Sequence, residues 1–148
     1  MDLLLWRHAD AEDGFVDAER RLTAKGAKQA ARVAKWLKKR LPADASVIAS
    51  PARRAQETAR ALTRNFRTVK EVGTGATAEK LLAAAGWPDA GGVVVVVGHQ
   101  PVLGEAAALL LSGASADWNI KKGAIWWFAS RERGERAQLR AVISPDLL

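Results

Sequence analysis

Short apolar runs that stop abruptly at polar residues are the most regular pattern along the chain. Residues 3–6 are three leucines and a tryptophan, and residues 93–97 are five consecutive valines. Continuous apolar runs of this kind are typical of strands buried on both faces of a parallel sheet. Further strands are predicted at residues 45–49, at 67–72 as a weaker edge strand, at 125–129 and at 137–143.

Segments with helical periodicity separate these strands. Between Ala24 and Leu41, alanines and leucines recur at steps of three and four, which predicts a helix with one core-facing stripe. Thr23 is suited to cap its N-terminus and Pro42 to end it. Further helices are predicted at residues 53–65, 78–85 and 102–111. This alternation predicts a single α/β domain over residues 1–148, a three-layer α/β/α sandwich with a mostly parallel central sheet.

Polar residues with related chemistry follow three of the predicted strands. Arg7 and His8 follow the first strand, Arg54 comes shortly after the second, and His99 follows the valine run. Because the carboxyl ends of parallel strands meet at one edge of a sheet, we expect these side chains to surround one pocket. Guanidinium groups and backbone N–H groups at helix N-termini bind phosphate. The pattern therefore predicts a phosphate site. The sequence contains no glycine-rich P-loop, which excludes nucleotide hydrolysis of the P-loop type.

Composition narrows the chemistry further. The chain has no cysteine, which excludes disulfides, thiolate nucleophiles and Cys-based metal sites. Its two histidines are too few for a His-rich metal site, and its net charge of +7 favours anionic partners. No apolar run approaches the roughly 18 residues of a membrane-spanning helix. We therefore expect a cytoplasmic protein that needs no metal or cofactor and does not associate with membranes.

Four motifs, in order, resemble those of the histidine phosphatase (phosphoglycerate mutase-like) superfamily. Residues 5–9, Leu-Trp-Arg-His-Ala, resemble its Arg-His-Gly signature, and residues 20–26 resemble its Arg-x-Leu-Thr-x-x-Gly element. Residues 50–58 resemble its Ser-Pro-x-x-Arg-Ala-x-x-Thr segment, and residues 97–101 resemble its second-histidine motif. The short spacing between the last two motifs is most similar to the small phosphohistidine phosphatases of the SixA type.

The resemblance implies a role for five residues. His8 would be the nucleophile and would form a phosphohistidine intermediate. Arg7, Arg54 and His99 would hold the phosphoryl group, together with Arg20 from the loop after the first strand. A neutral imidazole can attack phosphorus in line, and the cationic groups would stabilise charge on the equatorial oxygens without a metal ion. The neighbouring arginines should lower the pKa of His8 and so favour its neutral form.

The sequence also departs from the family pattern. Ala9 stands where the family usually has glycine. Alanine is tolerated at such a position unless the residue needs a positive φ. Larger members carry a glutamate as general acid between the two histidines, whereas Glu71 and Glu79 lie outside any matching motif. We interpret this as the absence of that acid, which favours a substrate with a good leaving group, such as phosphohistidine. Arg21 and Arg53 match no motif role and are expected to form surface ion pairs.

Three functions are compatible with these residues. The first is a phosphatase that removes phosphate from phosphohistidine on a protein, through a pocket without a large lid. The second is a small-molecule phosphomonoesterase of the same superfamily, with a substrate wall formed by Trp87, Trp118, Trp126 and Trp127. The third is a non-enzymatic basic protein that binds nucleic acid through its Lys/Arg helix. The basic helix face of Lys28, Arg32, Lys35 and Lys39 is either a docking surface for an acidic partner or a solvated face. Partners are thus expected to be phosphorylated proteins or small phosphorylated substrates rather than nucleic acid.

Overall fold

A computed structural model describes residues 1–132 and 134–148, so residue 133, within the charged segment between the last two predicted strands, lies outside the described residues. The chain forms a six-stranded sheet in the order β3-β2-β4-β1-β5-β6. Its strands are β1 (Asp2–Arg7), β2 (Ser46–Ala49), β3 (Arg67–Thr68), β4 (Val93–Gly98), β5 (Ile125–Ala129) and β6 (Gln138–Ile143). The first four strands are mutually parallel, and β5 runs antiparallel to both β1 and β6.

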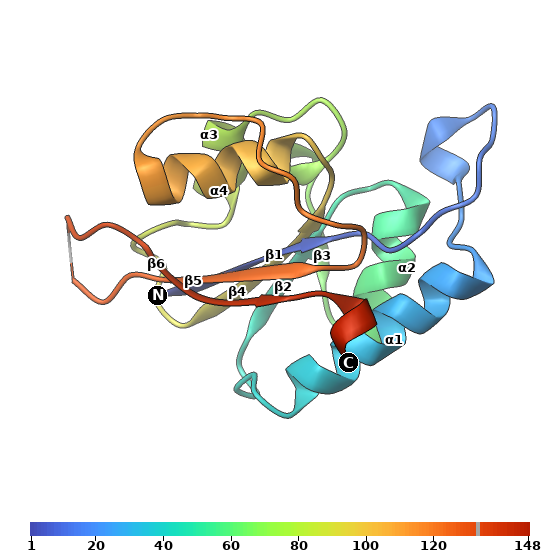
Figure 1. Ribbon diagram of the computed structural model, residues 1–148, viewed down its shortest axis with the longest axis horizontal. Coiled ribbons are helices and arrows are strands. Elements are labelled where there is room, and N and C mark those ends of the chain that lie inside the picture. The colour runs from blue at the N-terminus through green and yellow to red at the C-terminus, as the bar shows by residue number, and fades with distance from the viewer. Residues whose placement is uncertain (133) are drawn as a thin grey trace.

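Helices cover both faces of this sheet. The four α-helices are α1 (Ala24–Lys38), α2 (Arg53–Leu62), α3 (Ala78–Ala84) and α4 (Val102–Ser112). Figure 1 shows α1 and α2 on one side of the sheet and α3 and α4 on the other, which gives three layers. Each interface has its own apolar core: Leu4 and Val95 belong to the α1/α2 side, and Leu3 and Val96 to the α3/α4 side. The predicted α/β/α sandwich with a mostly parallel sheet is therefore confirmed.

The two strands that precede the histidines lie side by side at the centre of the sheet. The apolar runs of β1 and β4 pair in parallel along their whole length, from Asp2 opposite Val93 to Arg7 opposite Gly98. Both strands are buried from both sides, which explains why neither alternates apolar and polar residues. Their carboxyl ends are held level by this register. The register therefore places the residues that follow the two strands beside each other.

Several predicted boundaries change by a few residues. The helix that begins at Ala24 ends at Lys38 rather than near Leu41, although Thr23 caps it as predicted by accepting a hydrogen bond from Gly26 N. Of the predicted edge strand at residues 67–72, two residues pair with β2 and the end of the segment forms a 3₁₀ turn, η2 (Lys70–Val72). Val72 is fully buried, so packing under the sheet edge overrides its strand preference.

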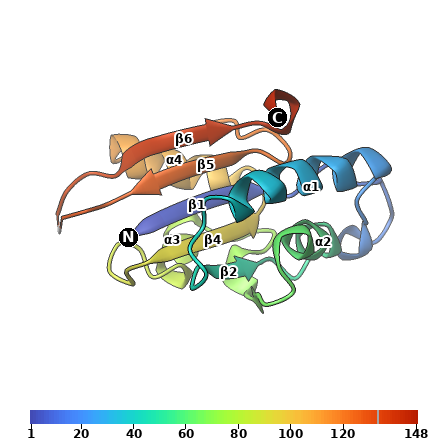
Figure 2. The same ribbon diagram turned by 90° about the horizontal axis from the view of Figure 1, so that it is seen from below.

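Two further 3₁₀ turns lie near α1. The turn η1 (Asp17–Glu19) lies in the loop between β1 and α1, and η3 (Pro145–Leu147) follows β6. The C-terminal turn η3 contacts α1, and Figures 1 and 2 both show it beside that helix. Within the described residues, no helix is long and apolar enough to cross a membrane.

Candidate active site

The site lies at the carboxyl ends of β1 and β4, where both histidines follow their strands. The backbone N–H of His8 donates to Gly98 O at 3.0 Å, so the parallel ladder continues into the site. The rings of His8 and His99 lie with their centroids 5.1 Å apart and their planes tilted by 56°. Both residues are at least nine-tenths buried. Strand register rather than loop conformation thus sets the distance between the two imidazoles.

The tautomer of His8 follows from its hydrogen bond. Nδ1 lies 2.8 Å from the carbonyl oxygen of Ala9, and because a carbonyl oxygen only accepts, Nδ1 carries the proton. The lone pair is then on Nε2, the ring nitrogen left to the cavity that His8 lines. This is the orientation of a nucleophilic imidazole whose second nitrogen is held by the backbone.

Burial keeps this imidazole neutral. Desolvation is the largest cause that lowers the pKa of His8, to about 4, while the hydrogen bond to Ala9 O acts in the opposite direction. The positive charges of Arg54, Arg7 and Arg20 lower the pKa further. The arginines therefore act in the predicted direction, but the main cause is burial. At neutral pH the lone pair of His8 is available.

His99 is neutral for the same reasons. Burial is the largest cause that lowers its pKa, to about 3, and repulsion from Arg54 and from His8 in its protonated form lowers it further. Its Nε2 lies 2.7 Å from Ser50 Oγ, a residue at the end of β2, whose hydroxyl also accepts from Ala52 N. Ser50 thus fixes the ring of His99 from the third strand. The motif around Ser50 indicated that strand end, but its contact with the second histidine was not predicted.

Thr58 fixes the loop that carries the nucleophile. Its hydroxyl is fully buried on α2, donates to Arg54 O at 2.8 Å and accepts from Ala9 N at 3.1 Å. Ala9 is itself fully buried and has a negative φ, so alanine replaces the family's usual glycine there without backbone strain. The hydrogen bonds of Thr58 join the turn after His8 to the first turn of α2.

Three arginines line the cavity with the histidines, as predicted. Arg54 is 4% exposed, and its guanidinium donates to the backbone oxygen and the carboxylate of Asp17 at 2.9 and 3.1 Å. Arg20 pairs with the other carboxylate oxygen of Asp17 at 3.1 Å. Arg7 donates to Ile120 O at 2.9 Å. Asp17, which sequence patterns did not single out, therefore positions two of the three arginines from the η1 turn.

Buried polar atoms without a partner concentrate in this cavity. Among the described residues, four buried side-chain nitrogen or oxygen atoms lack a hydrogen-bond partner, and three of them are Arg7 Nε, Arg54 Nε and His99 Nδ1. Leaving such groups unpaired costs about 1–3 kcal/mol each. Their concentration around one cavity indicates a site built for an anion that accepts several hydrogen bonds.

The remaining wall of the cavity comes from segments that sequence patterns did not indicate. The cavity has a volume of about 360 Å³, and its lining is completed by the segment 73–76, the first residues of α4 and Lys122. Glu105 on α4 supplies the one carboxylate among the described lining residues. It lies beyond the second histidine, outside the segment in which an acid was sought. The sequence position of Glu105 could have indicated this. It lies three residues after Val102, so one turn of the predicted helix brings its side chain back to the edge of the sheet where His99 lies.

Other predicted residues lie outside the site. Arg21 pairs with Glu12 at 2.9 Å, and Arg53 pairs with Glu57 at 3.6 Å, so both form surface ion pairs as predicted. Among the described lining residues, no tryptophan forms the predicted apolar wall. Trp118 instead packs against Trp126, with ring centroids 6.2 Å apart. Trp87 and Trp127 pack against the two apolar cores.

Comparisons with known proteins agree with this geometry. A family model described as histidine phosphatase superfamily (branch 1) matches residues 3–75. The structure of the protein histidine phosphatase SixA complexed with tungstate is similar with a TM-score of 0.80 and 24% sequence identity, covering 99% of each chain. A protein assigned as phosphohistidine phosphatase SixA from Nakamurella multipartitia gives a TM-score of 0.80 and 27% identity, over 97% of this chain and 95% of that chain.

Relatives with other substrates share the fold. A phosphoserine phosphatase mutant from Entamoeba histolytica, in complex with phosphoserine, gives a TM-score of 0.74 and 18% identity over 99% of this chain and 98% of that chain. A search of curated protein sequences gives no significant match. Motif order, the family model and the SixA-like fold lead to one conclusion. Residues 3–75 match the histidine phosphatase superfamily, and the chain as a whole has the phosphoglycerate mutase-like fold of SixA.

Proposed function

We propose that this protein removes phosphate from phosphohistidine on a protein, through a covalent intermediate on His8. The observation that carries the proposal is the buried, neutral imidazole of His8, with its proton on Nδ1 and its Nε2 left to a cavity lined by three arginines and His99. A nucleophile in a ring of cationic donors is suited to phosphoryl transfer. A SixA protein histidine phosphatase among the similar structures supports the same reaction.

The reaction proceeds in two displacement steps. In the first step His8 Nε2 forms a bond to phosphorus while the bond from phosphorus to the leaving nitrogen of the substrate breaks, and that nitrogen departs as a protonated imidazole. In the second step water attacks phosphorus, the bond to His8 breaks, and inorganic phosphate leaves. Arg7, Arg54 and Arg20 stabilise the negative charge on the equatorial oxygens in both steps. His99 donates from its neutral ring to the same oxygens.

Glu105 is our candidate for the group that moves protons in these steps. Its carboxyl group lines the cavity together with His8 and His99, at the start of α4. A carboxyl group there can protonate a leaving group in the first step and accept a proton from water in the second. Substituting Glu105→Gln should lower kcat more for phenyl phosphate than for p-nitrophenyl phosphate, because the better leaving group needs less help. Equal losses for both esters would exclude this role.

The proposed intermediate can be trapped directly. Wild-type protein quenched during turnover of ³²P-labelled phosphoramidate or phosphohistidine peptide should carry acid-labile label, and His8→Ala should carry none. Arg54→Ala should lower kcat/KM by roughly 100- to 1000-fold, as loss of a transition-state hydrogen-bond donor does. Arg53→Ala is the matched control, because it removes the neighbouring guanidinium from a surface ion pair. Label on His8→Ala would contradict the assignment of the nucleophile.

A small-molecule phosphomonoesterase is the second candidate. It is favoured by the similarity in fold to the phosphoserine phosphatase, whose substrate is a free amino acid phosphate. Comparing kcat/KM for phosphohistidine peptides with kcat/KM for phosphoserine and for sugar, nucleotide and aryl phosphates separates the two candidates. A preference for one small phosphate over every phosphopeptide would overturn the protein substrate.

A further inference from the structure

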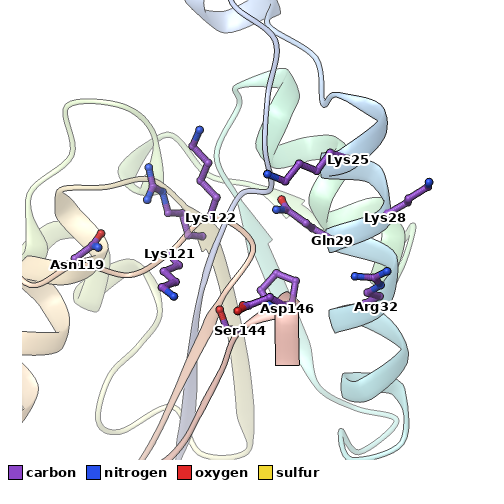
Figure 3. Close-up of a pocket in the computed structure, with 11 residues that line it drawn as sticks. Lys25, Lys28, Gln29, Arg32, Asn119, Lys121, Lys122, Ser144 and Asp146 are labelled. Carbon is purple, nitrogen blue, oxygen red and sulfur yellow. The ribbon is translucent and has the colours of Figure 1, made fainter. Parts of the chain in front are cut away.

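A second, strongly basic hollow lies beside the active site. This basic cleft has a volume of about 710 Å³ and runs between α1 and the segment that leads into β5. Figure 3 shows Lys25, Gln29 and Arg32 on α1, with Lys121 and Lys122 on the opposite segment. Its lining residues are Arg7, Lys25, Lys28, Gln29, Arg32, Asn119, Lys121, Lys122, Ser144, Pro145 and Asp146.

The basic cleft is continuous with the catalytic cavity. Arg7 and Lys122 line both hollows. The guanidinium of Arg7 donates to Ile120 O at 2.9 Å, which fixes it against the segment that forms one wall of the cleft. A molecule in the cleft would therefore lie directly beside a phosphoryl group held by Arg7. This position is suited to the part of a substrate that surrounds its phosphorylated residue.

The charges in the basic cleft are not balanced within the protein. Six of its lining residues are cationic and only Asp146 is acidic. Lys122 pairs with Asp10 at 3.1 Å, but none of the ion pairs among residues 1–132 and 134–148 contains Lys25, Lys28, Arg32 or Lys121. Like charges gathered around a hollow disfavour the folded state and attract anions.

The shape and lining of the cleft indicate the kind of anion. None of its eleven lining residues is aromatic, so the cleft offers no aromatic ring on which nucleic-acid bases could stack. On α1, Lys25, Lys28 and Arg32 form a row about 10 Å long, because a helix rises 1.5 Å per residue. A row of this length opposite two more lysines fits several carboxylates spread over a protein surface better than a single phosphate.

We propose that the basic cleft binds an acidic surface of the phosphorylated protein substrate and thereby directs its phosphohistidine toward His8. This proposal rests on the proposed function, because it needs a protein substrate. The proposal assigns a specific role to part of the basic face of α1. The sequence alone left two roles open for that face, a docking surface or a solvated surface. Lys28 and Arg32 line the cleft, whereas Lys35, further along α1, and Lys39, the residue that follows its last turn, do not.

This difference within one helix provides a matched experiment. The double variant K28E/R32E changes two cations in the cleft, and K35E/K39E makes the same charge change with the same four-residue spacing outside it. The probes are two synthetic phosphohistidine peptides, one with aspartates and glutamates around the phosphohistidine and one with serines and glutamines, together with p-nitrophenyl phosphate. For each protein, kcat/KM is measured for all three probes at low and high salt, and thermal melting checks that both variants fold.

For K28E/R32E, the ratio of kcat/KM for the acidic peptide to that for p-nitrophenyl phosphate should fall about tenfold, since each reversed charge loses an attraction and adds a repulsion. K35E/K39E should change that ratio less than twofold, and high salt should reduce the wild-type preference for the acidic peptide. Equal ratios for the two variants would overturn the docking proposal and leave the phosphatase assignment intact.

A binding measurement makes the test independent of turnover. Fluorescence anisotropy of a labelled, unphosphorylated acidic peptide should show binding to the wild type and to K35E/K39E, with weaker binding to K28E/R32E. Such binding supports the role of the cleft in binding acidic peptides, whether or not the wild type hydrolyses the phosphopeptide. Failure to hydrolyse the phosphopeptide would overturn the proposed substrate alone. Tighter binding of a DNA oligonucleotide of equal charge, weakened by K28E/R32E, would overturn the proposal in favour of nucleic acid.

Discussion

The two buried histidines should make the stability of this protein depend on pH in a window where few other groups titrate. Folding lowers the pKa of His8 to about 4 and that of His99 to about 3, from an ordinary value of 6.5. Because both pKa values are lower in the folded state, the unfolded chain binds more protons below pH 6.5. Stability must therefore fall as pH falls from about 6.5 toward the folded-state values.

The size of this effect follows from the same values. At pH 5 both imidazoles are protonated in the unfolded chain and almost entirely neutral in the folded protein. Each histidine then contributes a loss of about 2 kcal/mol between pH 7.5 and pH 5, or about 4 kcal/mol for the pair. This is a large fraction of the ordinary stability of a domain of this size, roughly 5–15 kcal/mol. Aspartates whose pKa is lowered, such as Asp2 and Asp10, lose their stabilisation mainly below this window.

Urea denaturation followed by tryptophan fluorescence, repeated at half-unit steps of pH, measures this loss. H8Q and H99Q should each keep about half of the wild-type dependence, and the double variant H8Q/H99Q should be nearly flat between pH 7.5 and 5.5. Saturating phosphate should weaken the wild-type dependence, because a bound anion favours the protonated rings. A wild-type curve that is flat in this window, or a dependence that survives in the double variant, would refute the argument.

Three further substitutions test individual contacts. Thr58→Val leaves the backbone N–H after the nucleophile without an acceptor and should cost about 1–3 kcal/mol in urea denaturation, with Thr58→Ser close to wild type. Asp17→Asn removes a half-exposed carboxylate that competes with phosphate for Arg54, so inorganic phosphate should inhibit roughly two- to fivefold more strongly; weaker inhibition would contradict this. Gly104→Ala would place a Cβ 1.7 Å from Trp118 O. The free energy of unfolding should therefore fall by about 1–3 kcal/mol or more, although alanine has the better helix propensity. An unchanged free energy of unfolding would be inconsistent with this packing.

The central part of the site could be predicted because it depends on local patterns. Two uninterrupted apolar runs, each with a histidine two residues after its end, are enough to indicate two buried parallel strands with their ends level. Register then brings His8 and His99 together whatever the intervening loops do. The cap at Thr23 and the end of α4 at Gly113, which has a φ of 79°, are equally local, since each depends on the chemistry of a single residue.

The parts that could not be predicted depend on contacts between distant segments. Asp17 contacts Arg54 across 37 residues, and Lys122 contacts Asp10 across 112 residues. No local pattern marks either carboxylate, because an exposed acid in a loop resembles any other until the loop is placed. Glu105 is a similar case, since it joins the site only through the position of α4 above the sheet.

The central position of β1 also affects how the chain folds. This strand comes first in the sequence, but its partners β4 and β5 lie at residues 93–98 and 125–129. During synthesis, Leu3, Leu4 and Leu5 must therefore stay unpaired until most of the chain has left the ribosome. Such long-range pairing closes slowly and exposes an apolar strand to aggregation in the meantime. Expression at low temperature, or with chaperones that shield short apolar segments, should therefore increase the yield of folded protein.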